Sequence, residues 1–136
     1  EAYALDLFVA GQAWASQQGL ILVDTKYEFG MVDDELIVID EIHTPDSSRY
    51  WIKDEYEARF NSGQNQLMLD KENIRQWLIG KGFLGDGTPP ELDDDIRSLL
   101  SEKYIELYHK LTNKEFDPKV GDVSDRIAKS LESLDI

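Results

Sequence analysis

The sequence predicts an α+β fold, in which a mostly antiparallel sheet is covered on one side by helices. Apolar residues recur at helical spacing over residues 2–18, 94–111 and 124–134. An apolar and then alternating pattern, interrupted by a turn, runs through residues 20–42 and is typical of a β-hairpin. The length of 136 residues suits one domain, or part of a larger one, with a core of useful size.

The amino-terminal segment predicts one helix followed by two strands. Residues 2–18 are rich in Ala, Leu and Gln, and Gly19 is a suitable residue to end a helix. The segment from Leu20 to Phe29 has the pattern of a strand, and residues 30–34 can supply a turn. Glu35 to Ile42 then has the pattern of the returning strand of a hairpin.

The remaining segments predict helices separated by loops. Residues 43–51 are rich in turn-forming residues, and residues 54–66 are polar and irregular. A helix is expected from Asp70, as an N-cap, to about Gly80. A longer helix is expected from Asp94 to about Leu111, because acidic residues suit the positive end of a helix. A last amphipathic helix is expected over residues 124–134.

Composition and charge disfavour several classes of function. The chain carries 14 Lys and Arg against 28 Asp and Glu, and its net charge of −14 argues against nucleic acid or an anionic membrane as a partner. An anionic substrate would need local cations or a divalent metal ion. The chain has no cysteine, which excludes disulfides and thiol nucleophiles. Its longest apolar run, LILV at 20–23, is far too short to span a membrane, and a cytoplasmic location is expected.

A row of ionisable residues lies on the first predicted strand. Asp24, Lys26 and Glu28 are two residues apart, so a strand would place them on one face. In the expected hairpin, Glu28 and Asp40 would be neighbours across the two strands, and a cation between them would relieve their repulsion. Mg²⁺ commonly binds one or two carboxylates together with substrate phosphates. A solvated charged face explains the same spacing, so the residues alone leave both interpretations open.

Two further groups of residues could recognise an anion. The turn TPDSSRYW contains Asp46, Ser48 and Arg49, and the guanidinium group of Arg49 suits a phosphate or a carboxylate. Lys71 and Arg75 are four residues apart on the next predicted helix, so both project from one face. A capped turn and an ordinary solvated helix face are the simpler explanations from the residues alone.

Taken in order, these segments resemble the phosphoribosylaminoimidazole-succinocarboxamide synthase (SAICAR synthase) family of purine biosynthesis. Three motifs carry the resemblance: VDTKYEFG at 23–30, IDEIHTPDSSRYW at 39–51 and DKENIRQWL at 70–78. The segment PPELDDDIRSLLSEKYIELYHKLTN at 89–113 resembles the closing helix of the family. The likeness covers about residues 1–115, and residues 116–136 are less diagnostic.

The resemblance implies an ATP-dependent ligase. Members of the family join the carboxylate of 5-aminoimidazole-4-carboxylate ribonucleotide to the amine of L-aspartate, and ATP is cleaved to ADP and phosphate. An acyl phosphate is the implied intermediate, so the protein needs no nucleophile of its own. It needs Mg²⁺, cations around the transferred phosphoryl group, and accurate positioning of the reactants.

The resemblance also implies roles for particular residues. Glu28 and Asp40 would be the Mg²⁺ ligands, and the catalytic residues Lys26 and Asp24 would contact the imidazole nucleotide or its reacting carboxylate. The implied substrate-binding residues are Asp46, Ser48, Arg49, Lys71 and Arg75.

The resemblance leaves out the amino-terminal lobe of the family, which supplies much of the ATP pocket. The chain opens with EAYALDLF, inside a predicted helix and without an initiator methionine. We therefore expect residues 1–136 to be a carboxy-terminal portion that carries the metal and nucleotide-substrate half of the site and is inactive alone. A non-catalytic fragment that binds nucleotide or Mg²⁺, or mediates subunit contacts, is the alternative. Strands left without partners would favour self-association, so a homo-oligomer is also open.

Overall fold

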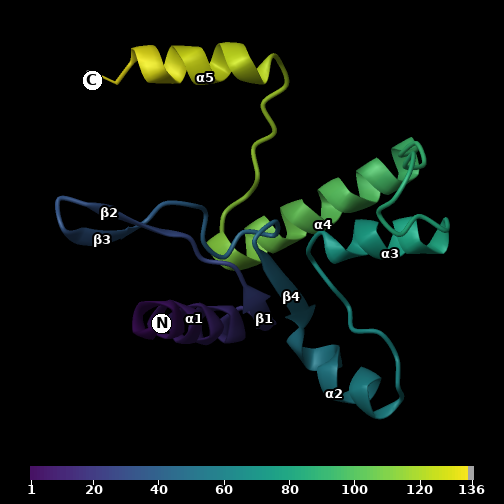
Figure 1. Cartoon of the computed structure of the whole chain (residues 1–136). Helices are drawn as coiled ribbons and strands as arrows, with labels where there is room; N and C mark the ends of the chain where they lie inside the picture. The colour runs from purple at the N-terminus through teal and green to yellow at the C-terminus, as the bar shows by residue number, and fades with distance from the viewer. Residues whose placement is uncertain (135–136) are drawn as a thin grey trace.

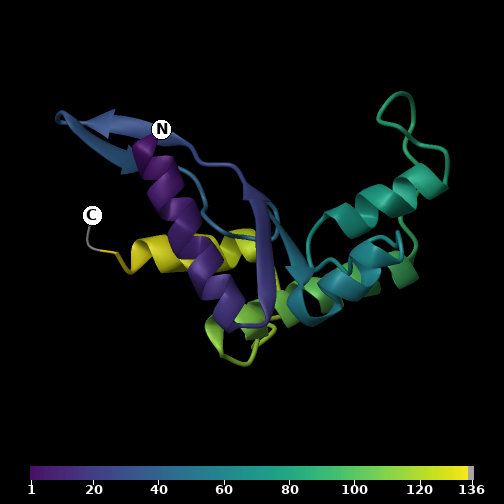
Figure 2. The ribbon, with the colours of Figure 1, turned by 90° about the horizontal axis from the view of Figure 1, so that it is seen from below.

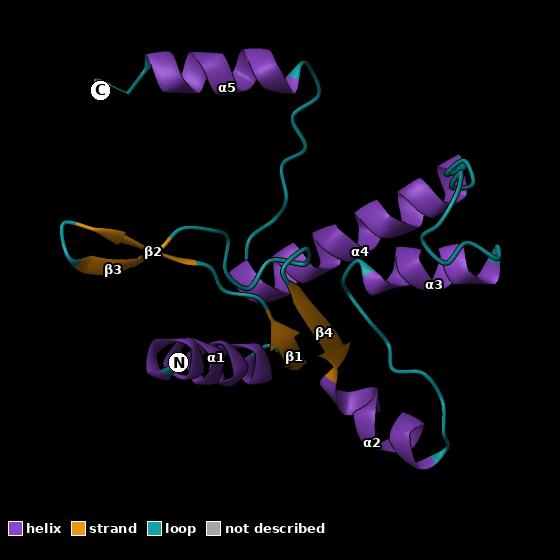
Figure 3. Ribbon diagram, viewed as in Figure 1, coloured by secondary structure: helices purple, strands orange, loops and turns teal. Residues whose placement is uncertain are grey.

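The computed structural model describes residues 1–134, and within that range it contains helices and short antiparallel strands (Figure 1). In chain order the elements are α1 (Ala2–Gln17), β1 (Leu20–Thr25), β2 (Phe29–Val32), β3 (Glu35–Val38), β4 (Ser48–Ile52), α2 (Lys53–Asn61), α3 (Glu72–Gly80), α4 (Asp94–Thr112) and α5 (Val123–Glu132). Figure 3 shows that the helices dominate and that the strands lie in two separate places. The predicted α+β class is confirmed.

The strands pair differently from the predicted hairpin. Strand β1 pairs with β4, and β2 pairs with β3, so the described residues form two antiparallel sheets of two strands each. The expected continuous strand from Leu20 to Phe29 is interrupted after Thr25, and only its last part joins a hairpin. The prediction that residues 43–51 form a loop was wrong for β4, and the prediction that residues 54–66 are irregular was wrong for α2.

The core explains why β4 rather than β3 pairs with β1. Leu20 lies opposite Ile52 and Leu22 lies opposite Tyr50, so the four side chains share one face of the β1–β4 sheet. Helices α1 and α4 add apolar side chains to the same cluster, which comprises Ala15, Leu20, Leu22, Tyr50, Leu69 and Leu107, with Phe8, Ile52 and Leu111 packed against it. Figure 2 shows α1 running beside β1. The expectation that helices cover one side of the sheet therefore holds for α1 and α4.

A bulge in β1 determines which side chains of this strand point away from the core. The pairing shifts between Leu22 and Asp24, so Asp24 lies opposite Arg49 and Thr25 lies opposite Ser48. Strict alternation after Leu22 would direct Asp24 to the core face. The extra residue reverses the alternation and turns the Asp24 carboxylate to the other face, as bulges beside functional sites commonly do.

Helix ends follow the predicted signals. Gly19, just past α1, has φ +71°, a left-handed conformation that glycine adopts without steric cost. Asp93 caps α4, because its carboxylate accepts the N–H of Ile96 at 2.9 Å. The end of α1 at Gly19 was predicted from the sequence, and the start of α4 was predicted from its acidic residues, whereas the cap by Asp93 was not predicted.

Two parts of the chain project from this core. Figure 1 shows the β2–β3 hairpin and helix α5 extending away from the other elements, with residues 113–122 leading to α5. Both carry large exposed apolar side chains: Met31, Val32, Leu36, Ile37 and Val38 on the hairpin, and Val123, Ile127 and Leu131 on α5. Within residues 1–134, no helix is both long enough and apolar enough to cross a membrane.

Candidate functional site

A polar cleft of about 540 Å³ lies between the segment after β1, the turn before β4 and the first turns of α3. Seven of the nine predicted site residues line it: Asp24, Lys26, Asp46, Ser48, Arg49, Lys71 and Arg75. The other two, Glu28 and Asp40, contact Lys26 at its edge. The structure thus brings together residues that are up to 51 positions apart in the sequence. Sequence reasoning missed Glu41 and Ile74, which also line the cleft.

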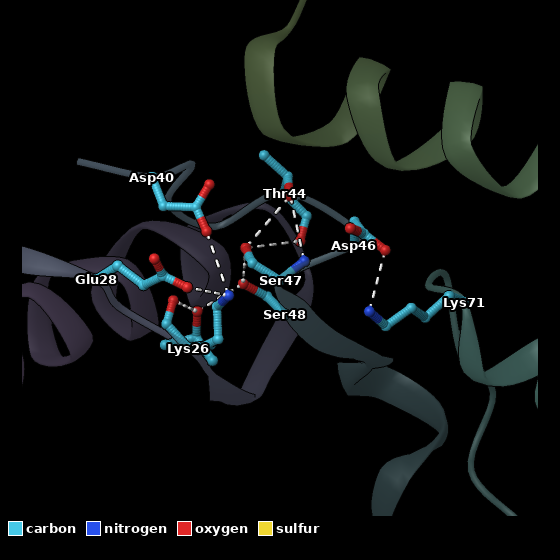
Figure 4. A network of polar contacts seen from close by, with 9 residues as sticks. Lys26, Glu28, Asp40, Thr44, Asp46, Ser47, Ser48 and Lys71 are labelled. Atoms are coloured by element: carbon cyan, nitrogen blue, oxygen red, sulfur yellow. Dashed lines mark hydrogen bonds and ion pairs between the residues drawn. The ribbon is translucent and has the colours of Figure 1, made fainter. Parts of the chain in front are cut away.

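Lys26 lies between two carboxylates at one end of the cleft, as Figure 4 shows. Its Nζ atom is 2.5 Å from Oε1 of Glu28 and 3.3 Å from Oδ2 of Asp40. The hydrogen bond to Glu28, and then that to Asp40, raises the pKa of Lys26. The backbone N–H of Glu41, followed by the Glu41 side chain and Lys26, lowers the pKa of Asp40. The ammonium group of Lys26 therefore remains charged, and the carboxylates of Glu28 and Asp40 both point toward it.

Arg49 and Asp24 form a bidentate pair across the β1–β4 sheet. The Nε atom of Arg49 lies 2.8 Å and 3.0 Å from the two carboxylate oxygens of Asp24, and its second terminal nitrogen also contacts that group. The hydrogen bond from Arg49 lowers the pKa of Asp24, although burial opposes the shift, and the same bond raises the pKa of Arg49. Both side chains are nearly half exposed, so the pair adds little to stability and can exchange for another anion at low cost.

The other two cations of the cleft are also held by nearby acids. The Nζ atom of Lys71 lies 3.0 Å from Oδ1 of Asp46, and Figure 4 shows these side chains facing one another. Arg75 reaches Oε2 of Glu72 at 3.3 Å, one turn back on α3. Lys71 and Arg75 are more than half exposed, and both can therefore reach a ligand in the cleft.

The turn before β4 is ordered by hydroxyl groups. The Thr44 carbonyl accepts the N–H of Ser48 at 2.9 Å, and the Thr44 hydroxyl accepts the N–H of Ser47 at 3.3 Å. The Ser48 side chain is buried, and its hydroxyl contacts the hydroxyl of Thr25 at 2.9 Å. Ser48 thus helps to fix the turn, while the Asp46 side chain projects from it toward Lys71 (Figure 4).

Asp70 joins β4 to α3 beneath the cleft. Its fully buried carboxylate accepts the N–H of Tyr50 and the N–H of Glu72, each at 2.8 Å. The prediction of Asp70 as the N-cap of α3 was wrong by one residue, because Lys71 holds that position without a side-chain cap; the Asp70 carboxylate instead bonds the first N–H of α3 from one residue earlier, and it also bonds β4. Burial raises the pKa of Asp70, whereas the two N–H donors lower it. Because Asp70 lies next to Lys71 and bonds the residue after Arg49, it sets the distance between these two cations.

The acidic residues do not form a complete metal cage. Among residues 1–134, no group of three or more His, Cys, Asp or Glu side chains is placed to hold a metal ion. Glu28 and Asp40 instead provide two oxygen donors that converge on the Lys26 ammonium group. Two carboxylates fit a magnesium ion that keeps water and substrate phosphate as its remaining ligands.

The family model for SAICAR synthetase matches residues 1–89, which is more than half of the chain. The chain belongs to the SAICAR synthetase family. The phosphoribosylaminoimidazole-succinocarboxamide synthase of Cytophaga hutchinsonii is 50% identical over 134 residues, and that of Bacteroides thetaiotaomicron is 45% identical over 134 residues. In each case the match covers 96% of this chain and 43% of the relative, so the chain spans less than half the length of these relatives.

Solved structures of the SAICAR synthetase family are similar in fold to this chain over the part that matches. The SAICAR synthase of Saccharomyces cerevisiae, solved with SAICAR bound, superposes with a TM-score of 0.71 at 34% identity. This match covers 85% of the present chain and 38% of the yeast chain. A SAICAR synthetase solved with ADP gives a TM-score of 0.51 at 27% identity over 79% of this chain and 34% of that one. The family resemblance predicted from the three sequence motifs is therefore confirmed.

Proposed function

We propose that this chain carries the nucleotide-substrate and metal-binding half of the active site of a SAICAR synthase. The reaction is the ATP-dependent joining of L-aspartate to the carboxylate of 5-aminoimidazole-4-carboxylate ribonucleotide. The γ-phosphoryl group of ATP passes to a carboxylate oxygen of the nucleotide and ADP leaves. The aspartate amine then attacks the acyl carbon, the bond to the phosphate oxygen breaks, and the amine loses a proton. Family membership and the composition of the cleft support this proposal.

One observation carries the proposal more than any other. The chain has a net charge of −14 and 14 Lys and Arg residues, yet four of these cations line a single cleft: Lys26, Arg49, Lys71 and Arg75. Each is paired with an acid, and all four cations are themselves 46–68% exposed, which fits exchange of the acid for a phosphate or carboxylate of a ligand. A cleft of about 540 Å³ is large enough for part of a nucleotide.

The chemistry divides the cleft into two ends. At the end near β1, Lys26 and Asp24 would contact the imidazole and its reacting carboxylate, and the positive charge of Lys26 would stabilise the anion. Arg49, which borders this end through its pair with Asp24, would bind the phosphate together with Lys71 and Arg75 of the other end, because a guanidinium fork and an ammonium group are the usual phosphate partners. Asp46 and Ser48 would hold the turn that presents these groups.

Mg²⁺ is proposed as the cofactor on the donor set of Glu28 and Asp40. Both carboxylates converge on the position of one cation, which Lys26 supplies in this structure. When bound there, Mg²⁺ would shield the charge of the phosphoryl group. ATP and L-aspartate are proposed as the further substrates, by similarity to the relatives named above.

The alternative function is a non-catalytic module that binds nucleotide without turnover. The observation that favours it is the length of the match, because the chain spans only 43% of its relatives. Both functions predict nucleotide binding without formation of ADP or product by this chain alone. Incubation with Mg²⁺, ATP, L-aspartate and the aminoimidazole carboxylate ribonucleotide, together with the part of a relative that this chain does not cover, distinguishes the two: the half-site should then form product, and the module should not. Turnover by the chain alone would contradict the half-site proposal.

Isothermal titration calorimetry of the aminoimidazole carboxylate ribonucleotide tests the binding site itself. The wild-type chain should bind in the presence of Mg²⁺, and Arg49→Ala should weaken binding by about 10-fold or more because a bidentate, charge-assisted contact is lost. Arg97→Ala is the matched control, since Arg97 is an exposed arginine on α4 outside the cleft. Equal affinities of both variants would count against the assigned site.

A further inference from the structure

His43 lies at the centre of contacts behind the cleft, in a backbone conformation that few residues adopt. Its φ angle is +59°, in the left-handed region, and it stands midway between Asp40 and Asp46 in the sequence. Such conformations persist where the surrounding contacts determine them, and they cluster at functional segments. The side chain is half-buried.

Contacts with three parts of the chain hold His43 in this position. The Nε2 atom lies 2.6 Å from the hydroxyl oxygen of Tyr27, and the two rings meet edge to face with centroids 5.7 Å apart. The His43 carbonyl accepts the hydroxyl of Tyr50 at 2.7 Å. The imidazole ring also lies against Gly11 of α1, where a Cβ atom would be 2.5 Å from Cε1 of His43. The ring therefore occupies a space that only a glycine in α1 leaves open.

The contact between Tyr27 and His43 joins the two segments that carry the charged groups. Tyr27 stands between Lys26 and Glu28, in the interval where β1 has ended and β2 has not begun. Backbone hydrogen bonds across this interval run from Lys26 N–H to the Ser47 carbonyl at 3.0 Å and from Ile39 N–H to the Glu28 carbonyl at 3.1 Å. The side-chain bond is an additional cross-link at a place where the regular ladder is missing.

We propose that Tyr27 and His43, seated on Gly11, are positioning residues that set the distance between the segment of Lys26 and Glu28 and the segment of Asp40. We name this group the His43 clamp. The effect of the clamp on ligand binding rests on the proposed function, because the separation of these segments determines how Lys26 and the two carboxylates contact a ligand. No member of the clamp lines the cleft.

Tyr27→Phe tests the clamp, because it removes one hydroxyl and keeps the ring. Amide hydrogen exchange at Lys26 and Ile39, followed by NMR, should accelerate about 3- to 10-fold, the change expected for the loss of one hydrogen bond. Exchange at Ile52, whose N–H bonds the Leu67 carbonyl in the core region, should stay unchanged. Tyr3→Phe is the matched control, since Tyr3 is 65% exposed on α1.

Substitutions at His43 provide the second arm of the test. His43→Leu should reproduce the effect of Tyr27→Phe, and the double variant should be no worse than either single variant, because both changes break the same bond. His43→Gln should keep the slow exchange of the wild-type chain, since the glutamine amide group reaches the position of Nε2. In calorimetry with the aminoimidazole carboxylate ribonucleotide and Mg²⁺, affinity should fall about 3- to 10-fold in Tyr27→Phe and stay at the wild-type value in His43→Gln.

The two readouts separate the clamp from the proposed function. Unchanged exchange at Lys26 and Ile39 in Tyr27→Phe would overturn the clamp, as would additive effects in the double variant. Accelerated exchange with full nucleotide affinity would overturn its positioning role. If the wild-type chain binds no nucleotide, the proposed function fails, and the exchange data alone decide whether the clamp sets the distance between the two segments.

Discussion

Gly11→Ala should destabilise the chain, although the same change stabilises most helices. Gly11 lies inside α1 and is buried. In an ordinary helix interior, alanine is favoured over glycine by about 1 kcal/mol. Here the new methyl group would lie 2.5 Å from Cε1 of His43, 2.6 Å from its Nε2 and 2.8 Å from Cδ2 of Leu22. All three distances are far below van der Waals contact.

The magnitude follows from what must move. Overpacking of this kind costs about 1–3 kcal/mol. The His43 ring can relieve it only by leaving Tyr27, which gives up a hydrogen bond worth about 0.5–1.5 kcal/mol. Leu22 is 1% exposed and belongs to the packed core cluster. After the gain in helix propensity is subtracted, we expect a net loss of about 0.5–3.5 kcal/mol in the free energy of unfolding.

Urea denaturation followed by tryptophan fluorescence measures this change. Gly80→Ala is the matched control, because Gly80 is the last residue of α3 and an added Cβ atom would have no neighbour within 4 Å. The control should be neutral or more stable by about 0.5 kcal/mol. If Gly11→Ala stabilises the chain as much as Gly80→Ala does, the position of His43 against α1 is wrong.

Three further predictions concern the buried carboxylate, pH and the arginine of the cleft. Asp70→Ala should lower the free energy of unfolding by about 3 kcal/mol, because two N–H groups lose a charged acceptor, whereas Asp86→Ala, on an exposed loop, should have little effect in the same urea titration. Burial lowers the pKa of His43 in the folded chain. As pH falls, the unfolded chain therefore binds a proton at His43 first, near pH 6.5, and stability should be lost as pH falls through the lower pKa of the folded state. Urea midpoints between about pH 8 and pH 5.5 should depend less on pH in His43→Gln than in the wild-type chain. An equal pH dependence in that variant would assign the effect to other groups. Arg49→Lys keeps the charge but loses the planar fork, so calorimetry should show nucleotide affinity reduced by about 10-fold, and unchanged affinity would refute a bidentate contact.

Local signals in the sequence predicted α1, α3, α4 and α5, although α2 was missed. Gly19 and Asp93 mark the end of α1 and the start of α4, and both do so through a conformation or a hydrogen bond made within a few residues. Such signals depend only on neighbouring residues, so they can be read without knowledge of the fold. Seven of the nine site residues predicted from the sequence motifs line one cleft in the structure.

The missed features depend on contacts between distant segments. The segment SRYWI forms β4 because Tyr50 and Ile52 pair with Leu22 and Leu20, and a five-residue strand that contains an arginine gives little signal of its own. The bulge in β1 has no signature in its sequence, yet it directs Asp24 to Arg49. The position of His43 depends on Gly11, a residue distant in the sequence that lies against the His43 ring.

A titration of the ¹⁵N-labelled chain with the aminoimidazole carboxylate ribonucleotide and Mg²⁺, followed by NMR, tests the central proposal most directly. The assigned site predicts that amide shifts change at residues 24–28, at 46–49 and at the start of α3, with little change at the apolar groove lined by Tyr104, Tyr108 and Phe116. Shifts confined to that groove, or no shifts in a folded chain, would contradict the proposal that the cationic cleft binds the nucleotide.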